Sequence, residues 1–203
     1  MDVLETYERP YDEEIPVVCL DEKSLELHDE RHTPIRSRRG TKRDHEYVRK
    51  GTANLFMMTE PKGGKHYVRV TERRTRRDFA QCLKWLAQKY PKAVTIHLVM
   101  DNLNTHNEKS LVETYGLVEG RRLWARFSVH YTPKHASWLN QAEIAIGVTQ
   151  RCCLGKDRLG SMQQVKERVI PFWKKRRNQR WKIDWRFTPK KAQNWLKTFQ
   201  SEH

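Results

Sequence analysis

Two acidic residues, far apart in the sequence, stand at the ends of runs that are typical of buried strands. Asp21 follows the apolar run at residues 15–20, and Asp101 follows the run at residues 94–100. Runs of β-branched and aliphatic residues predict strands that are covered on both faces. A single aspartate in such a place is more often a turn opener or a helix cap than a functional group. The functional interpretation therefore depends on other carboxylates pointing to the same place.

A third acid, Glu143, lies on the apolar side of a predicted helix that begins at Ser137, a favourable N-cap residue. Glu143 is four residues after Leu139 and three before Ile146, so we expect its carboxylate to face the sheet. Burying a lone glutamate there is costly unless it is paired or bound to a cation.

Three carboxylates that meet in one place favour a metal site. Grouped carboxylates repel one another, which raises their pKa values unless a cation neutralises them. A site made of carboxylates alone, without histidine or cysteine ligands, favours Mg²⁺ or Mn²⁺. Two such ions are the arrangement used for in-line displacement at phosphorus. The sequence therefore predicts two divalent ions at Asp21, Asp101 and Glu143.

The charge distribution predicts a polyanionic partner. Residues 1–30 contain eleven acids and two basic residues, so their formal charge is −9, and residues 31–203 carry +24 of the total of +15. An excess of this size attracts nucleic acid with a strong dependence on salt. With the three acids, it predicts phosphodiester chemistry on DNA or RNA.

The elements that must position these acids follow a mixed α/β order. We expect strands at residues 15–20, 52–59, 66–71, 94–100 and 126–131. We expect helices at residues 79–90, 108–113, 137–153 and 165–173, and a last helix with Trp195, Leu196 and Phe199 on its apolar face. The predicted division is a flexible acidic lead-in at residues 1–14, a catalytic domain at residues 15–160, and a basic, tryptophan-containing helical extension at residues 161–203.

Three strings around the acids resemble the acidic motifs of a DDE transposase. They are residues 18–23 (VCLDEK), 98–106 (LVMDNLNTH) and 130–143 (HYTPKHASWLNQAE). The branch that the chain resembles is the bacterial insertion-sequence relatives of the mariner superfamily, and the likeness runs from about residue 10 to the C-terminus.

The resemblance implies an RNase H-like fold, with a mixed five-stranded sheet flanked by helices. It also implies that Asp21 bridges two metal ions, while Asp101 and Glu143 each complete one site. The implied reaction is hydrolysis of a phosphodiester to free the end of the element, followed by attack of the 3′-hydroxyl on target DNA.

Further residues in these motifs are weaker candidates. Asn102, Asn104 and His106 could hydrogen-bond the metal ligands or the scissile phosphate, although turn formation and capping explain them almost as well. Lys134, His135 and Trp138 are candidates for DNA contacts, with loop packing as an equal alternative.

The chain departs from the family pattern at its N-terminus. Full-length members of the family have helix-turn-helix domains before the catalytic domain, but fewer than twenty-five residues precede Asp21. A frame-split half, a truncated copy and a fragment of a longer protein all fit this pattern. The expected partners are DNA (transposon ends and target), a second copy of the chain, and a helix-turn-helix half that is separately encoded or missing.

Two other functions stay open: an RNase H-like nuclease that only hydrolyses, and an inactive or repurposed DNA-binding remnant of a transposase. The acidic N-terminus has no apolar run, no stretch is long enough to span a membrane, and the four cysteines form no Cys-x-x-Cys pair. We therefore expect a soluble protein of the bacterial cytoplasm that associates with the nucleoid and has no membrane partner.

Overall fold

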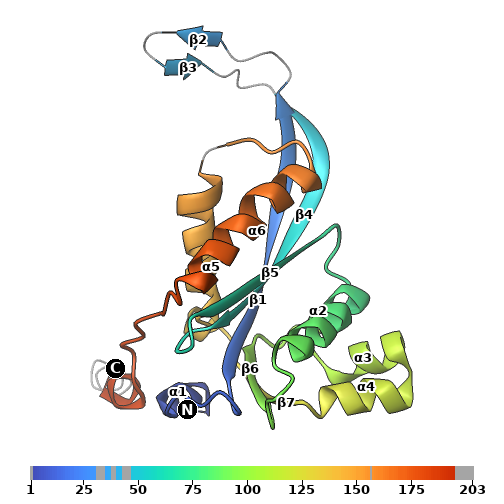
Figure 1. Cartoon of the computed structure of the whole chain (residues 1–203), viewed down its shortest axis with the longest axis vertical. Helices are drawn as coiled ribbons and strands as arrows, with labels where there is room; N and C mark the ends of the chain where they lie inside the picture. The colour runs from blue at the N-terminus through green and yellow to red at the C-terminus, as the bar shows by residue number, and fades with distance from the viewer. Residues whose placement is uncertain (1, 31–34, 38–39, 43–46, 156, 195–203) are drawn as a thin grey trace, which may run out of the picture.

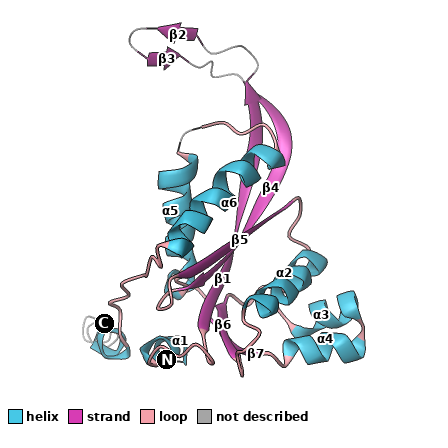
Figure 2. Cartoon of the chain, in the orientation of Figure 1, coloured by secondary structure: helices cyan, strands magenta, loops and turns pink. Residues whose placement is uncertain are grey.

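A mixed five-stranded sheet forms the centre of the protein (Figure 1, Figure 2). The computed structural model describes residues 2–30, 35–37, 40–42, 47–155 and 157–194. In the order β5-β4-β1-β6-β7, the strands are β5 Lys65–Thr71, β4 Tyr47–Glu60, β1 Val17–Glu30, β6 Ile96–Met100 and β7 Phe127–Tyr131. The first three pair antiparallel, while β6 and β7 run parallel to β1. The predicted α/β fold, a mixed five-stranded sheet flanked by helices, is confirmed.

Helices cover both faces of this sheet, as Figure 1 shows. One face carries α2 Arg76–Lys89, α3 Glu108–Tyr115 and α4 Leu117–Trp124, and the other carries α5 Ala142–Val148, the π-helical turn Thr149–Leu154 and α6 Met162–Asn178. Side chains alternate along β4, so Phe56 packs in the cluster with Leu83 of α2, whereas Met57 packs in the cluster with Trp173 of α6.

The register of β1 on β6 positions two of the predicted acids. In this parallel pair Cys19 lies opposite Val99. Asp21 and Asp101 each follow two residues later, so both come from the same edge of the sheet and from the same side of the pleat. This pairing thus places the two acids on the same side of the sheet, but Asp21 lies inside β1, which continues to Glu30, and not at the end of a strand as the sequence predicts.

Local sequence explains why α2 begins and ends where it does. Thr75 and Asp78 form a capping box, in which each side chain accepts a hydrogen bond from the backbone N–H of the other residue. Pro91 follows the helix and cannot continue it. The buried face includes Phe79 and Leu83, at helical spacing.

Beyond the helices, β1 and β4 continue side by side as a long antiparallel ribbon (Figure 1). Residues between them include a second, two-stranded sheet made of β2 Ile35–Ser37 and β3 Gly40–Lys42. This part of the chain is the basic stretch for which the sequence shows no clear periodicity.

The N-terminal segment differs from the predicted flexible lead-in. Asp2–Glu8 form helix α1, and Val3, Leu4 and Tyr7 are buried. These side chains pack against Val99 and the start of the α5 segment, in one cluster. The seven-residue helix is stabilised by this packing because a helix so short is marginal in isolation.

The segment before Glu143 also differs from the prediction of one helix starting at Ser137. Ser137–Leu139 form a 3₁₀ turn, and α5 begins only at Ala142. The Asn140 side chain separates the two, since its oxygen accepts from the Ala142 N–H (3.1 Å) and its amide donates to the Leu20 carbonyl (2.7 Å). A side chain that bonds the backbone in this way competes with helix continuation.

The predicted C-terminal extension begins with α6, which shares the core of the sheet rather than standing apart from it. Its buried residues Val165, Val169 and Trp173 belong to the cluster that contains Met57. The chain then follows the β4–β5 turn, where Ile183 N–H donates to the Pro61 carbonyl (3.1 Å). The predicted apolar face of the last helix, at Trp195, Leu196 and Phe199, lies outside the described residues.

Across the described ranges, no helix has both the length and the apolar character needed to cross a membrane.

A pair of substitutions in α1 tests whether this helix belongs to the fold. We expect Leu4→Ala to lower the free energy of unfolding by about 2–4 kcal/mol, because it removes buried methyl groups. The matched control Glu5→Ala changes an exposed neighbour and should stay within about 0.5 kcal/mol of the native value. Urea unfolding measures both. Equal stability of the two variants would mean that residues 2–8 are the flexible lead-in that the sequence predicts.

Candidate active site

Asp21 is the most perturbed acid of the candidate site. It is partly buried on β1, and its Oδ1 accepts a hydrogen bond from the Glu22 N–H (2.7 Å). Burial raises the pKa of Asp21 to about 7, with further contributions from repulsion by Glu143 and Asp101, while the backbone hydrogen bond opposes the rise. The ionised form of Asp21 is thus disfavoured in the protein alone, which is the electrostatic condition that a bound cation relieves.

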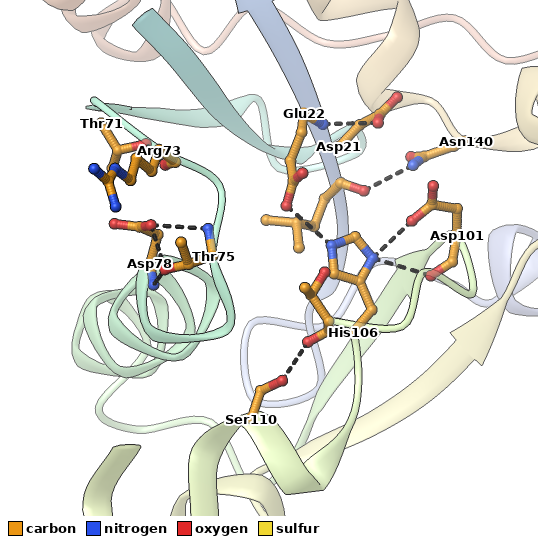
Figure 3. A network of polar contacts seen from close by, with 12 residues as sticks. Asp21, Glu22, Thr71, Arg73, Thr75, Asp78, Asp101, His106, Ser110 and Asn140 are labelled. Atoms are coloured by element: carbon orange, nitrogen blue, oxygen red, sulfur yellow. Dashed lines mark hydrogen bonds and ion pairs between the residues drawn. The ribbon is translucent and has the colours of Figure 1, made fainter. Parts of the chain in front are cut away.

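Asp101 is held by a buried histidine (Figure 3). His106 Nδ1 lies 2.6 Å from Asp101 Oδ1, and Nε2 lies 3.0 Å from Glu22 Oε1. The imidazole also stacks on Phe79, with 4.6 Å between ring centroids, and Tyr131 donates to the His106 carbonyl (2.7 Å). His106 therefore fixes the orientation of Asp101 by contacts on several sides.

The charge on this histidine follows from its two carboxylate partners. Burial alone would lower the pKa of His106, but the hydrogen bonds to Asp101 and Glu22 outweigh it and raise the pKa to about 9. At neutral pH the imidazole is therefore a cation with a carboxylate at each nitrogen. Glu22, whose side chain is 4% exposed, has its charge balanced by this contact.

Glu143 differs from its predicted position facing the sheet. It is exposed in the first turn of α5, while Ala142 and Ala145 take the buried positions. The later start of α5 explains the difference, because the apolar stripe predicted for a helix from Ser137 no longer applies. Glu143 instead lines a groove of about 460 Å³ that Asp21 also lines.

Two cations border the same groove. Lys23 and Arg151 are exposed and line it together with Asp21 and Glu143. Neither Lys23 nor Arg151 is a candidate on sequence evidence alone. Their side chains can attract a phosphate to a groove whose other charged groups are carboxylates.

The convergence of the three acids is therefore partial. Asp21 and Glu143 share the groove, and Asp101 is close enough to repel Asp21 but is paired with His106. In the part of the chain that the structure describes, no three acidic, histidine or cysteine side chains are arranged to hold a metal ion. The donor set still fits a hard cation, because it consists of carboxylates. Burial, and after it repulsion by Glu143 and Asp101, raises the pKa of Asp21, which a bound cation would offset.

The weaker candidates divide into turn residues and exposed loop residues. Asn102 and Asn104 are exposed in the turn after β6. The Asn104 carbonyl accepts a hydrogen bond from the Asn107 side chain (2.9 Å), so turn formation accounts for Asn104. Trp138 is 49% exposed and packs edge-on against Phe187, with 5.0 Å between ring centroids. Two other exposed residues on this loop are Lys134 and His135.

Sequence reasoning missed Glu22 as a functional residue, although it identified His106. The available signal is that Glu22 is an acid adjacent to Asp21 inside a strand. Side chains alternate along a strand, so Glu22 points to the α2 face while Asp21 points to the α5 face. The pairing of Glu22 with His106, 84 residues away, could not be read from spacing.

Comparison with known proteins gives a family match and a fold match. A family profile described as DDE superfamily endonuclease matches residues 16–166. No curated protein is similar enough in sequence to count as a match.

Two solved structures resemble the fold at low sequence identity. The Mos1 mariner paired end complex with Mn has a TM-score of 0.51 at 14% identity, covering 90% of this chain and 60% of that chain. The Mos1 transposase paired-end complex with left transposon end has a TM-score of 0.52 at 15% identity, covering 89% of this chain and 56% of that chain. This chain thus spans less than two thirds of the length of those two chains.

The raised pKa of Asp21 predicts a pH-dependent effect of Asp21→Asn on stability in EDTA. The pKa of about 7 in the folded state lies above the ordinary value of 3.8, so ionised Asp21 destabilises the fold. This cost is fully present above pH 7 and disappears as the pH falls toward 4. Urea unfolding should therefore show Asp21→Asn more stable than the native chain at about pH 8, with a smaller difference at about pH 5. The control Glu5→Gln should show no such trend, and a difference for Asp21→Asn that does not depend on pH would contradict the raised pKa.

Proposed function

The chain belongs to the DDE superfamily endonucleases, and from this premise we propose that it is a transposase catalytic domain that cuts DNA strands and joins them to target DNA. The observation that carries the proposal is the position of the acids. Asp21, inside β1, and Asp101, just after β6, each lie two residues beyond a pair in the parallel register of these strands, and Glu143 lines a groove that Asp21 also lines. Groups placed at the C-terminal edge of parallel strands commonly form active sites.

Divalent cations complete the proposed site. Asp21, Asp101 and Glu143 are the residues that would hold two ions, Mg²⁺ or Mn²⁺, which would activate the attacking oxygen and stabilise the leaving oxygen. One of the structurally similar complexes contains Mn, which agrees with this requirement. The raised pKa of Asp21 also supports it, because burial, and after it repulsion by Glu143 and Asp101, disfavours the ionised form when no cation is bound.

The protein's own side chains bind and orient the DNA in this proposal. Lys23 and Arg151 draw a phosphate into the groove, where their charges offset the repulsion between the phosphate and the acids. His106 holds Asp101 in place and also balances Glu22. His106 is therefore a positioning residue, since its two ring nitrogens contact the carboxylates of Asp101 and Glu22.

The proposed reaction has two steps that share one chemistry. Water first attacks a phosphodiester, and the P–O bond to the 3′ oxygen breaks, which leaves a 3′-hydroxyl on the element. That hydroxyl then attacks a phosphodiester of target DNA, so one P–O bond forms as another breaks. A nuclease would perform only the first step.

The partners follow from the same proposal. We propose that the chain binds transposon ends and target DNA, and that a second copy of the chain joins it to hold two ends. The formal charge of +24 on residues 31–203 supports DNA binding. Recognition of specific end sequences by a helix-turn-helix unit outside this chain stays a prediction.

Plasmid nicking tests the assignment of the acids. We expect nicking by the native chain in Mn²⁺ or Mg²⁺, and a loss of at least about 100-fold in Asp21→Asn, Asp101→Asn and Glu143→Gln. Glu5→Gln, which removes one exposed negative charge, is the control and should nick at the native rate. Retained salt-sensitive DNA binding in the inactive variants would show that they fold. Native nicking rates in any of the three variants would remove that acid from the mechanism.

A pre-cleaved DNA end with a free 3′-hydroxyl separates transposition from hydrolysis. We expect the native chain with Mn²⁺ to join this end covalently to a target plasmid, and Asp101→Asn to form no joined product. Nicking without any joined product would assign the chain to the hydrolytic nucleases.

The metal requirement tests the role of His106. We expect His106→Gln to raise the Mn²⁺ concentration for half-maximal nicking by about 10–100-fold, because Asp101 loses the group that orients it. The rate at saturating Mn²⁺ should largely recover. His135→Gln, an exposed histidine without such contacts to the acids, is the control. An unchanged Mn²⁺ requirement with a lower saturated rate would contradict a positioning role.

A further inference from the structure

A turn rich in arginine connects β5 to α2 at the same edge of the sheet as Asp101. We call residues 72–77 (ERRTRR) the arginine turn. β5 runs parallel to β1, because both strands pair antiparallel with β4, and β6 is also parallel to β1. The C-terminal end of β5 therefore lies at the edge where β6 ends and Asp101 follows.

The strand register places this turn close to Asp21. Asn54 of β4 lies opposite Ser24 of β1 on one side and opposite Thr71, the last residue of β5, on the other. Strand geometry then puts Thr71 roughly 10 Å beyond Asp21 along the strands and roughly 10 Å to its side. The major groove of B-DNA is about 12 Å wide. A duplex that reaches the acids therefore also brings phosphates within reach of the arginine turn.

Side-chain hydrogen bonds fix both ends of the turn. Asn54, which is 4% exposed, accepts from Ser24 Oγ (2.7 Å) and donates to the Glu72 carbonyl (3.0 Å). At the other end, the capping box of Thr75 and Asp78 sets the start of α2. The backbone of the turn is thus held in place by the protein itself, so little ordering is needed when a ligand binds.

The turn is also connected to the histidine that holds Asp101. Phe79, in the first turn of α2, stacks on the His106 ring with 4.6 Å between centroids. Figure 3 shows Arg73 and Thr75 on one side of His106 and Asp101 on the other side. The arginine turn and the acids therefore keep a fixed position relative to one another.

Three of the four arginines have no counter-charge in the protein. Arg73, Arg74 and Arg77 are exposed, and in the described part of the chain none of them forms an ion pair. Arg76 differs, since its guanidinium lies 3.2 Å from Glu113 Oε1. An unpaired guanidinium presents donors in a geometry that matches the oxygens of a phosphate.

The charge balance of this edge favours a polyanion as the partner. Residues 71–78 contain four arginines and two acids, so their formal charge is +2. The candidate active site beside them has four carboxylates, which belong to Asp21, Glu22, Asp101 and Glu143. DNA that approaches these carboxylates is repelled unless cations nearby offset the repulsion. The arginine turn provides such cations.

We propose that the arginine turn binds the phosphate backbone of double-stranded DNA beside the candidate active site, through Arg73, Arg74 and Arg77. The inference rests on the proposed function for its choice of DNA as the ligand. Contacts to phosphate carry no sequence information, so the turn positions a duplex without selecting it. These contacts need neither metal ions nor cleavage.

Fluorescence anisotropy of a short labelled duplex with the full chain in EDTA tests this proposal, because EDTA prevents cleavage and metal bridging. Each phosphate contact contributes about 0.9 to the slope of log affinity against log salt concentration. We expect Arg73→Gln/Arg74→Gln to reduce the size of this slope by about 1.5–2. At about 0.1 M salt the same variant should bind at least about tenfold more weakly than the native chain.

Two matched variants separate this surface from the basic character of the whole protein. Lys89→Gln/Lys92→Gln removes the same number of exposed positive charges at the other end of α2, before β6 begins, and should change the slope by less than about 0.5. Arg73→Lys/Arg74→Lys keeps the charge and should keep the slope near its native value. This retention would show that the glutamine variant loses binding through charge.

Equal salt slopes for the native chain and Arg73→Gln/Arg74→Gln would overturn the proposal. An equal loss in Lys89→Gln/Lys92→Gln would also overturn it, because the effect would then belong to net charge alone. The two proposals fail separately. A chain that binds duplex DNA through this turn but never nicks it in Mn²⁺ contradicts only the proposed function. A chain that nicks DNA while the arginine variant keeps native binding contradicts only this inference.

Discussion

The structure depends on the parallel pairing of β1 with β6, which brings Asp21 and Asp101 close enough to repel each other. Because Cys19 lies opposite Val99, the side chains of Asp21 and Asp101, two residues later on each strand path, project from the same side of the sheet. Burial, and after it repulsion by Glu143 and Asp101, raises the pKa of Asp21. A shift of one residue in this register would turn one of these side chains to the other face of the sheet. The packing on both faces prevents that shift. The fold therefore keeps the two carboxylates close despite their electrostatic repulsion.

His106 relieves part of this repulsion without removing the acids from the site. As an imidazolium it contacts Asp101 and Glu22, which project from different strands. The acids thus experience two kinds of environment. Asp101 has a cationic partner, whereas Asp21 and Glu143 meet at a groove that Lys23 and Arg151 also border. The groove is where a phosphate and cations can complete the charge balance.

The sequence predicts the elements that carry continuous apolar runs or clear periodicity. The strand before Asp101 and the helix that contains Leu83 are examples, because burial on both faces or on one stripe constrains residue types directly. The apolar run before Asp21 marks only the start of β1, which continues to Glu30. The sequence does not predict α1, because residues 1–14 are mostly acidic and polar. Buried residues such as Leu4 and Tyr7 are too few there to show helical periodicity. Tertiary contacts decide the remainder. The hydrogen bond from the Asn140 side chain to the Leu20 carbonyl accompanies the later start of α5, which leaves Glu143 exposed. This contact joins residues 120 positions apart, so no local sequence pattern predicts it.

The central claim is that Asp21, Asp101 and Glu143 act as one cation-binding group. Anomalous diffraction from crystals grown with Mn²⁺ tests it most directly, because it locates the ion without reference to activity. We expect two Mn²⁺ ions, which together lie within about 2.0–2.3 Å of carboxylate oxygens from all three residues, as is usual for small hard cations. Mn²⁺ bound elsewhere, or at two of the acids while Asp101 stays paired with His106 beyond reach, would contradict it.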